Sequence, residues 1–279
     1  MDKKGRKCKV VALANQKGGV SKTTTTVNLG IGLARAGNRV LLIDSDPQAS
    51  LTASMGERQP DRLDKTLATV ITSIMEGQET EAEYGILTHE EGVQFLPANI
   101  DLAAVEVSLI SAMSREYMLK EYIETVAPYF DYIIIDCMPS LGMLTINALA
   151  AADSVIIPVQ AHYLPLKGMT QLVKTIGRVQ RKINPSLKVD GVLLTLADMR
   201  TNLARATAES LKQNYGRVVK VYKTVIPVSV KAAETSAAGK SIYRYDKNGA
   251  AAKAYADFTG EVMRDGEKQR HRHETTLSR

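Results

Sequence analysis

Short, wholly apolar runs alternate along the chain with longer segments whose apolar residues recur at helical spacing. A continuous apolar run is typical of a strand buried on both faces of a parallel sheet. Such runs predict strands over residues 10–14, 39–44, 93–97, 132–136, 154–159, 189–195 and 218–226. Helical spacing predicts helices over 23–36, 66–75, 101–110, 114–127, 143–151, 166–183, 202–214 and 249–264. The alternation predicts an α/β fold with a doubly wound, mostly parallel sheet and helices on both faces.

A glycine-containing turn follows the first predicted strand. Its residues are Gln16-Lys17-Gly18-Gly19-Val20-Ser21-Lys22-Thr23-Thr24, and a predicted helix begins within them. Backbone N–H groups of such a turn, with the positive end of the following helix, form an anion site. We therefore interpret the turn as a phosphate-binding loop in a P-loop NTPase, although Gln16 and Ser21 stand where the usual pattern has glycine. A glycine turn with incidental lysines is the alternative.

Two side chains of this loop have expected roles in binding a nucleotide. Lys22 is expected to reach the β- and γ-phosphates of a nucleotide, and the Thr23 hydroxyl to bind Mg²⁺. The expected nucleotide-contacting residues are Lys17, Gly18, Gly19, Val20, Ser21, Lys22, Thr23 and Thr24.

Carboxylates end two of the predicted strands. Asp136 follows an apolar strand, as does the Mg²⁺-binding Asp of P-loop enzymes, and Asp44 and Asp46 end another. Ligands bind at the carboxyl ends of strands in such sheets, where all three residues and the loop converge. Asp136 and Asp44 are thus candidate metal-site residues, and Asp46 is a candidate to orient an attacking water. A turn residue or helix cap is the alternative for each.

Composition limits the setting of this site. The chain has 279 residues, 44% of them hydrophobic, which suits one domain with a sizeable core. Its two cysteines form no disulfide or metal pattern, and its basic start leads into no signal-peptide core. Without an apolar run of membrane-spanning length, the chain is expected to be cytoplasmic.

Charge is distributed unevenly along the chain. Residues 1–160 hold 14 Lys and Arg against 20 Asp and Glu, whereas residues 161–279 hold 22 against 10. This asymmetry suggests that the second half contacts a polyanion, with a solvated basic surface as the alternative.

Several motifs together resemble one family. The segment Lys17-Gly18-Gly19-x-x-Lys22-Thr23 resembles the deviant Walker A motif of the ParA/MinD ATPases. Asp44-x-Asp46-Pro47-Gln48 is similar to the switch I motif of that family, and the segment 131–141 is similar to its Walker B segment. Further matches at 144–149, 155–160 and 198–203 resemble partition ATPases of the ParA/Soj type over about residues 9–263. Ser21 departs from the family glycine.

The resemblance implies an ATPase that uses ATP and Mg²⁺. It implies a single P-loop ATPase domain over residues 9–265, between a short basic segment (1–8) and a polar C-terminal tail (266–279). ATP would be sandwiched in a homodimer in which Lys17 reaches the partner's phosphates and Asp46 supports hydrolysis. Lys17, Lys22 and Asp46 are thus the expected catalytic residues, and Pro227 joins the expected nucleotide-binding residues.

The same resemblance implies DNA partition. The ATP dimer would bind double-stranded DNA without sequence preference at Arg200 and Lys231, and a ParB-like protein would stimulate hydrolysis. The protein would associate with the nucleoid and segregate a chromosome, plasmid or integrative element. Val228 stands where an arginine is usual, which is expected to weaken or shift DNA binding.

Three other functions are weighed against partition. A MinD-like membrane-surface ATPase needs an amphipathic C-terminal helix, but the residues after Arg264 include one large aliphatic side chain. The stripe Ala251, Tyr255, Phe258 and Val262 is therefore interpreted as core packing. A metallocluster reductase needs a cysteine pair that Cys8 and Cys137 do not supply. A nucleotide-gated binding protein with little turnover stays open because of Ser21.

Overall fold

The computed structural model describes residues 8–161, 165–216 and 219–277. Within these ranges, eight strands form one sheet in the order β3-β4-β2-β5-β1-β6-β7-β8. All neighbours are parallel except β3 and β4, so the expected doubly wound, mostly parallel sheet is confirmed. The strands are β1 (Lys9–Leu13), β2 (Val40–Ser45), β3 (Leu87–Thr88), β4 (Gln94–Leu96), β5 (Tyr132–Cys137), β6 (Ser154–Gln160), β7 (Lys188–Ala197) and β8 (Val221–Pro227).

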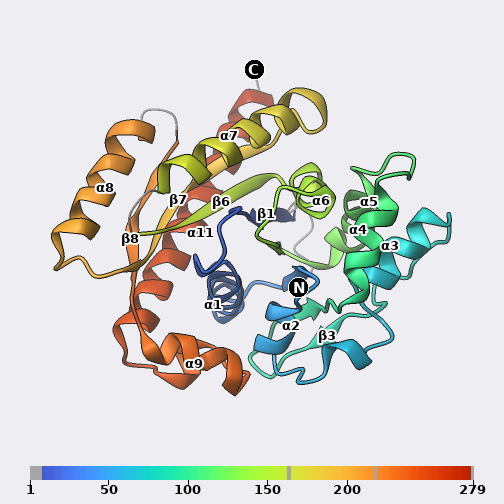
Figure 1. Cartoon of the computed structure of the whole chain (residues 1–279), viewed down its shortest axis with the longest axis horizontal. Helices are drawn as coiled ribbons and strands as arrows, with labels where there is room; N and C mark the ends of the chain where they lie inside the picture. Colours follow the sequence, from blue (N-terminus) through green and yellow to red (C-terminus); the bar gives the residue numbers. More distant parts are fainter. Residues whose placement is uncertain (1–7, 162–164, 217–218, 278–279) are drawn as a thin grey trace.

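Helices cover both faces of the sheet (Figure 1). The α-helices are α1 (Lys22–Arg35), α2 (Ser50–Ser54), α3 (Leu67–Met75), α4 (Asp101–Leu109), α5 (Met118–Val126), α6 (Met143–Ala151), α7 (Pro165–Lys182), α8 (Asn202–Tyr215), α9 (Val230–Ala238), α10 (Ile242–Tyr245) and α11 (Ala250–Leu277). Short 3₁₀ turns lie at Pro60–Arg62 and Ala127–Tyr129. One face of the sheet packs against α3 to α8, and the other against α1, α2, α10 and α11.

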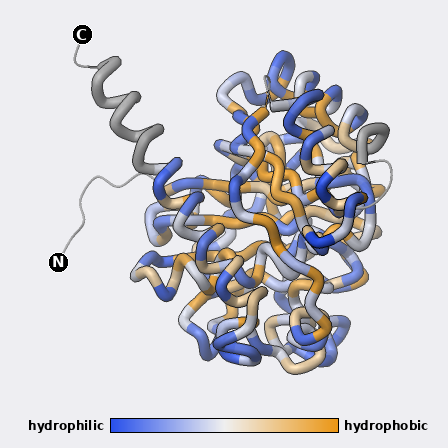
Figure 2. Tube along the Cα trace, turned by 90° about the vertical axis from the view of Figure 1, so that its left-hand side faces the viewer, coloured by the Kyte–Doolittle hydropathy of each residue, from blue (hydrophilic) through white to orange (hydrophobic). Residues whose placement is uncertain are grey.

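Alternation along β1 explains this two-sided core. Val10 and Ala12 belong to the core under α3 to α8, while Val11 and Leu13 belong to the core under α1 and α11. Successive side chains of a strand point to opposite faces, so a strand covered on both sides must be apolar throughout. The apolar strands accordingly run through the interior in Figure 2, with polar segments outside.

Two helix boundaries differ from expectation, and four short elements were not predicted. Helix α5 begins at Met118 rather than residue 114, because Ser114 adopts a left-handed backbone with φ of 49°. Helices α2, α9 and α10 and strand β3 were not predicted. Helix α11 does not end near residue 264; it runs to Leu277, through most of the segment expected to be a polar tail.

The position of β1 determines where a ligand can bind. It lies between β5 and β6, and the chain leaves its carboxyl end through the glycine-rich turn into α1. The order of the strands reverses here, since β2 and β4 lie on one side of β1 and β6 to β8 on the other. Such a reversal opens a crevice at the carboxyl ends of the strands.

Helix α9 is attached to the rest of the fold through a glycine contact. It ends at Ala238, is capped by Gly239 with a left-handed φ of 60°, and packs against α2. A Cβ on Gly239 would lie 2.9 Å from the Cα of Gly56, which follows α2. Two backbone segments far apart in sequence therefore meet here without intervening side chains.

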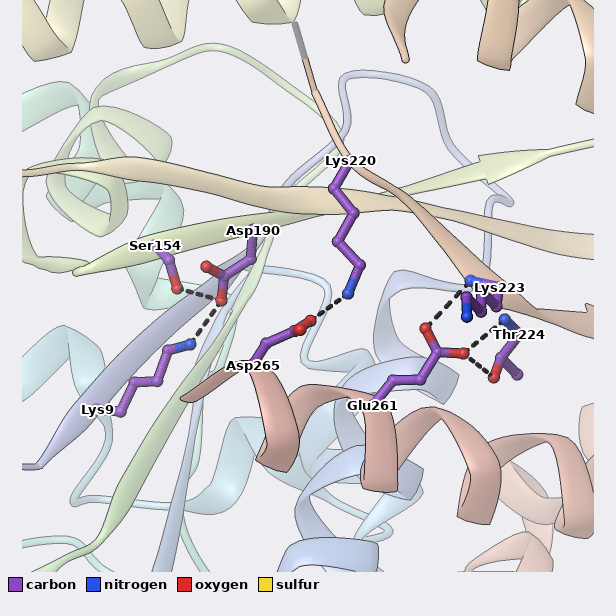
Figure 3. Close-up of polar contacts among 8 residues, drawn as sticks. All are labelled: Lys9, Ser154, Asp190, Lys220, Lys223, Thr224, Glu261 and Asp265. Carbon is purple, nitrogen blue, oxygen red and sulfur yellow. Dashed lines mark hydrogen bonds and ion pairs between the residues drawn. The ribbon is translucent and has the colours of Figure 1, made fainter. Parts of the chain in front are cut away.

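Buried charge joins three strands at the opposite, amino edge of the sheet (Figure 3). Lys9 Nζ lies 2.7 Å from Asp190 Oδ2, and Ser154 Oγ donates to the same oxygen at 2.8 Å. Both charged side chains are less than one-tenth exposed. This pair ties β1 to β7 across β6.

Helix α11 also covers the edge strand β8 through polar contacts (Figure 3). The Glu261 carboxylate accepts the backbone N–H groups of Lys223 and Thr224 and the Thr224 hydroxyl. Lys220 forms an ion pair with Asp265 on the same helix. An edge strand has unpaired N–H groups that attract other strands, and Glu261 occupies two of them.

The buried pair gives a prediction about stability. Lys9→Met should lower the free energy of unfolding by about 3–5 kcal/mol, because it removes the Lys9 cation that is paired with the buried Asp190 carboxylate. Urea denaturation measures the loss. Adding Asp190→Asn also removes the buried negative charge and should restore most of the lost stability. Equal losses in the single and double variants would contradict the explanation.

Candidate functional site

The glycine-rich turn is held from two neighbouring strands. The buried Asn15 side chain donates to Pro158 O of β6 at 2.7 Å and accepts the Lys17 N–H at 3.0 Å. On the other side, Thr195 of β7 donates its hydroxyl to Val20 O at 3.1 Å. Both contacts use side chains that are almost completely buried, so the turn is fixed to the sheet before any ligand binds.

The centre of the turn faces outward. Lys17, Gly18 and Gly19 are exposed, and Gly19 has a left-handed φ of 71° that glycine adopts without strain. No atom lies within 4 Å of a Cβ built on Gly18 or Gly19. The open space and the N-terminus of α1 leave backbone N–H groups accessible to an anion such as phosphate.

The two lysines of the turn lie in different surroundings. Lys22 is buried, and its Nζ donates to Lys17 O at 3.3 Å. Burial lowers the pKa of Lys22, and the nearby carboxylate of Asp136 opposes that shift. Lys17 is exposed, with its Nζ 3.5 Å from Gln160 Oε1. Lys22 is thus buried within the turn, whereas the Lys17 side chain lies on the surface of the molecule.

Ser21, which stands where the family has glycine, has a strained backbone conformation. It precedes α1 with φ of 62° and ψ of 33°, in the left-handed region. That conformation costs a non-glycine residue about 1–2 kcal/mol. Its side chain makes no capping hydrogen bond to α1. The loop therefore has backbone strain at the residue directly before Lys22.

Asp136 lies under the first turn of α1. Thr23 Oγ1 donates to Asp136 Oδ2 at 2.6 Å, and Thr26 Oγ1 donates to Asp136 Oδ1 at 3.3 Å. Burial raises the pKa of Asp136 to about 7, while the Thr23 hydrogen bond and the Lys22 cation oppose the shift. The predicted pair Thr23 and Asp136 is therefore in direct contact.

Asp44 lies beside Asp136, its register partner across β2 and β5, and it is completely buried. Thr52 of α2 donates both its N–H (2.8 Å) and its hydroxyl (2.7 Å) to Asp44 Oδ2. Thr52 Oγ1 in turn accepts the Ala98 N–H at 2.9 Å. Burial and the Asp136 charge raise the pKa of Asp44 to about 8, against the Thr52 hydrogen bonds.

Asp46 is more accessible than the other two carboxylates. It is half-buried, its N–H donates to Asp44 Oδ1 at 3.3 Å, and its Oδ1 accepts the Gln48 N–H at 2.9 Å. Its charge acts on both Lys22 and Asp136. Three carboxylates and one lysine therefore share the carboxyl ends of β2 and β5, beside the phosphate-binding turn.

These oxygens fit a magnesium ion that is shared with phosphates. Within the described ranges, no group of three or more His, Cys, Asp or Glu side chains is placed to hold a metal. Magnesium in nucleotide sites takes only one or two protein ligands and completes its shell with phosphates and water. Thr23 and Asp136 supply such a partial set, and a bound cation would favour the ionised form of the crowded carboxylates.

Pro227 lies at the far side of β7, at the end of β8. It lines a groove of about 1050 Å³ with the β7–α8 loop, Val228 and one face of α11. None of the described residues lining this groove comes from the phosphate-binding turn. The structure therefore separates Pro227 from the turn, and the predicted role of Pro227 in nucleotide binding stays a prediction.

The two expected DNA-contacting residues lie outside the carboxylate cluster and are paired with acids. Arg200, in the loop before α8, forms a bidentate contact with Asp198, and 90% of its side chain is exposed. Lys231, in the first turn of α9, lies 2.9 Å from Asp246 and is 59% exposed. Both cations are accessible, but each has a carboxylate as a competing partner.

Sequence reasoning missed the polar residues that hold the site together, namely Asn15, Thr26, Thr52 and Thr195. Thr26 follows Thr23 by three residues, so helical spacing alone would have placed its hydroxyl on the same face. The roles of Asn15, Thr52 and Thr195 depend on contacts between distant elements, for which the sequence has no local signal.

The strain at Ser21 gives a prediction about nucleotide affinity. Ser21→Gly removes a cost of about 1–2 kcal/mol for the left-handed conformation, and the greater freedom of glycine offsets part of the gain. With serine, the strain disfavours the loop conformation that binds ATP and so lowers its population. With glycine this cost is absent, and the variant should bind ATP up to about fivefold more tightly. Isothermal titration calorimetry measures the change.

Ser114 provides the matched control. It is also a left-handed serine, with φ of 49°, but it lies on the surface between α4 and α5. Ser114→Gly should leave ATP affinity unchanged. Weaker binding by the Ser21 variant would instead mean that the Ser21 hydroxyl contacts the nucleotide.

Comparisons with known proteins agree with this geometry. A family profile described as an AAA domain matches residues 8–189. The sporulation initiation inhibitor protein Soj of Bacillus subtilis is 45% identical over 258 residues, covering 92% of this chain and 99% of Soj. The chromosome partitioning protein ParA of Caulobacter vibrioides is 40% identical, covering 91% and 94%.

A solved structure extends the agreement to three dimensions. The cobyrinic acid a,c-diamide synthase of Mycobacterium smegmatis with bound ADP and magnesium has a TM-score of 0.80 and 38% identity, covering 93% of this chain and 96% of that one. Identity at this level over nearly whole chains, together with the two lysines of the turn and the strand-end carboxylates, identifies the family. The chain belongs to the ParA/Soj family of partition ATPases.

Proposed function

We propose that this protein is a Mg²⁺-dependent ATPase whose ATP-bound homodimer binds DNA and drives its partition. The observation that carries the proposal is the site at the end of β1. There an outward-facing glycine turn, the buried Lys22 and the contact between Thr23 and Asp136 meet. The ADP and magnesium bound in the Mycobacterium smegmatis structure support the same ligands here.

The surroundings of each residue in the proposed site indicate its role in binding or hydrolysing ATP. Residues 17–24 hold the phosphates, with Lys22 on the β- and γ-phosphates, and Pro227 bounds the far end of the nucleotide. Thr23 and Asp136 would hold a magnesium ion, which would supply charge neutralisation for phosphoryl transfer. Asp44, held by Thr52, supports the metal shell, and Asp46 orients the attacking water.

The dimer is proposed from the exposure of Lys17. Lys17 is exposed, with its Nζ 3.5 Å from Gln160 Oε1, whereas Lys22 is buried within the turn. A second subunit facing the turn would bring its phosphates within reach of Lys17, which completes both sites at once. ATP then acts as the condition for dimerisation, and hydrolysis separates the subunits.

DNA is the proposed polyanion for the basic second half of the chain. Arg200 and Lys231 are exposed, and a dimer presents two copies of each to one duplex, which raises affinity by avidity. Phosphate contacts of this kind read no bases. A ParB-like protein is the proposed activator, and the relatives named for chromosome partitioning support a role with a nucleoid-associated replicon.

The membrane-surface alternative has little support. No helix in the described parts of the chain combines the length and apolar character needed to cross a bilayer. The apolar stripe of α11, from Ala251 through Tyr255 and Phe258 to Val262, is buried in the core, so the interpretation as core packing is confirmed. These side chains therefore cannot contact a lipid surface.

The first prediction from this function concerns the two lysines and Asp46. Lys22→Ala should abolish ATP binding, whereas Lys17→Ala should keep binding but lose ATP-dependent dimerisation and hydrolysis. Asp46→Ala should keep the ATP dimer and slow phosphate release by about 100-fold or more, because the water is no longer oriented. Light scattering and a phosphate-release assay measure these outcomes.

Two results would contradict parts of the proposal. Dimerisation of the Lys17 variant with ATP would exclude its cross-subunit role. A wild-type protein that dimerises with ATP but releases no phosphate, with or without DNA, would instead be a nucleotide-gated binding protein.

The second prediction concerns DNA. Affinity of the ATP dimer should fall log-linearly with salt, by about 0.9 log unit per log unit of salt for each phosphate contact. Arg200→Glu and Lys231→Glu should weaken binding to all sequences and leave dimerisation unchanged. Biolayer interferometry with ATP, ADP and no nucleotide tests this across a salt series.

The acidic partner of Lys231 supplies the control. Asp246→Asn frees Lys231 of its carboxylate and should strengthen DNA binding, the opposite of the Lys231 variant. Equal binding in all nucleotide states, or a strong preference for one sequence, would exclude partition by this mechanism.

A further inference from the structure

Helix α4 has an exposed apolar face. Its large apolar side chains are Ile100, Val107, Ile110 and Met113, which are between 52% and 89% exposed. Ile100 and Ile110 flank the helix with helical backbone angles. Together with the exposed Ala103, the first three follow the spacing i, i+3, i+7 and i+10, which places them on one face of a helix. An exposed, contiguous apolar surface of this kind is typical of an interaction site.

The exposed face of α4 is also uncharged. Across residues 102–114, all of which the structure describes, Glu106 is the only charged residue, and its carboxylate accepts the Leu144 N–H of α6 at 3.4 Å. Arg115 follows, with its guanidinium bonded to Ile110 O. A nucleic acid would find few cations here. A helix that binds a membrane surface usually has several lysines or arginines beside its apolar face. The chemistry of the face therefore favours another protein surface as its partner.

Two contacts place α4 at the carboxyl edge of the sheet, the edge that holds the phosphate-binding turn. Directly after β4, which is parallel to β2, the Ala98 N–H donates to Thr52 Oγ1, the group that holds Asp44. Two turns into α4, Glu106 contacts the first turn of α6, the helix that follows the carboxyl end of β5. Helix α4 accordingly lies beside α6 (Figure 1). The apolar face and the candidate nucleotide site therefore belong to the same side of the molecule.

A second copy of the chain is the partner that this position indicates. In the proposed ATP dimer, on which this inference rests, the second subunit faces the turn and so comes to the carboxyl edge. Around a two-fold axis, each subunit meets the same surface of the other, so charged groups near the axis would face like charges. An uncharged apolar face has no such cost and can be buried. We propose that the exposed face of α4 packs against the second subunit and extends the dimer interface beyond the nucleotide.

The experiment measures dimerisation of the full-length protein by analytical ultracentrifugation with Mg²⁺ and the slowly hydrolysed analogue adenylyl imidodiphosphate. Val107→Asp should raise the dissociation constant of the dimer by about tenfold or more, because the interface then buries a charge from each subunit. Ile110→Asp, one turn further along the same face, should have the same effect. Both side chains are mostly exposed, so the thermal midpoints of the nucleotide-free variants should stay near that of the wild type.

Two controls separate the interface from other effects. Tyr129 is also an exposed large apolar residue, at 59%, but it lies in the turn before β5, at the amino edge of the sheet. Tyr129→Asp should therefore dimerise like the wild type. Isothermal titration calorimetry, at protein concentrations too low for dimers to form, should show that Val107→Asp binds the analogue with wild-type affinity.

The wild type distinguishes failure of this inference from failure of the proposed function. A wild type that stays monomeric with the analogue would overturn the proposed dimer itself. A wild type that dimerises, with both α4 variants dimerising equally well, would overturn only the role of α4. Equal weakening by Tyr129→Asp would do the same. Co-sedimentation of the wild type with phosphatidylcholine vesicles, lost in Val107→Asp, would assign the face to a lipid surface instead and would also overturn the proposal.

Discussion

The hydrogen bond between Thr23 and Asp136 joins the two parts of the molecule on which the site depends. It links the first turn of α1 to the end of β5, across the position where the phosphate-binding turn leaves β1. Asn15 and Thr195 fix the same turn from β6 and β7. The anion site is therefore part of the sheet, and its geometry is preorganised by strands that would have to separate before it could change.

The same geometry brings negative charges close together. Asp44 and Asp136 are register partners on adjacent strands, both buried, and the pKa of each is raised. Two carboxylates this close disfavour each other's ionisation, so the site is most stable when a cation is shared between them. Lys22 supplies part of that charge and a magnesium ion would supply the rest. Nucleotide and metal thus complete an arrangement that the chain alone leaves electrostatically unbalanced.

The sheet, the glycine-containing turn and the strand-end carboxylates could be predicted from the sequence, because each has a local sequence pattern. Apolar runs indicate strands buried on both faces. A residue directly after such a run lies at the carboxyl end of its strand, and in a parallel sheet these ends share one edge. Helix α9 was missed because its Ala, Thr and Ser residues have no apolar periodicity, although Ser229 and Gly239 are ordinary capping signals. The roles of Thr52 and Asn15 could not be predicted, since they arise from contacts between elements distant in sequence.

The contact between Gly239 and Gly56 has a consequence for how this protein can vary. Helix α9 carries Lys231, and α2 carries Thr52, the partner of Asp44. The distance between these two helices is set by the absence of two side chains. A methyl group at Gly239 would require a strained backbone and would also push the helices apart. A substitution there would increase the distance between the exposed Lys231 and the carboxylate cluster at the ends of β2 and β5, without altering any charged residue.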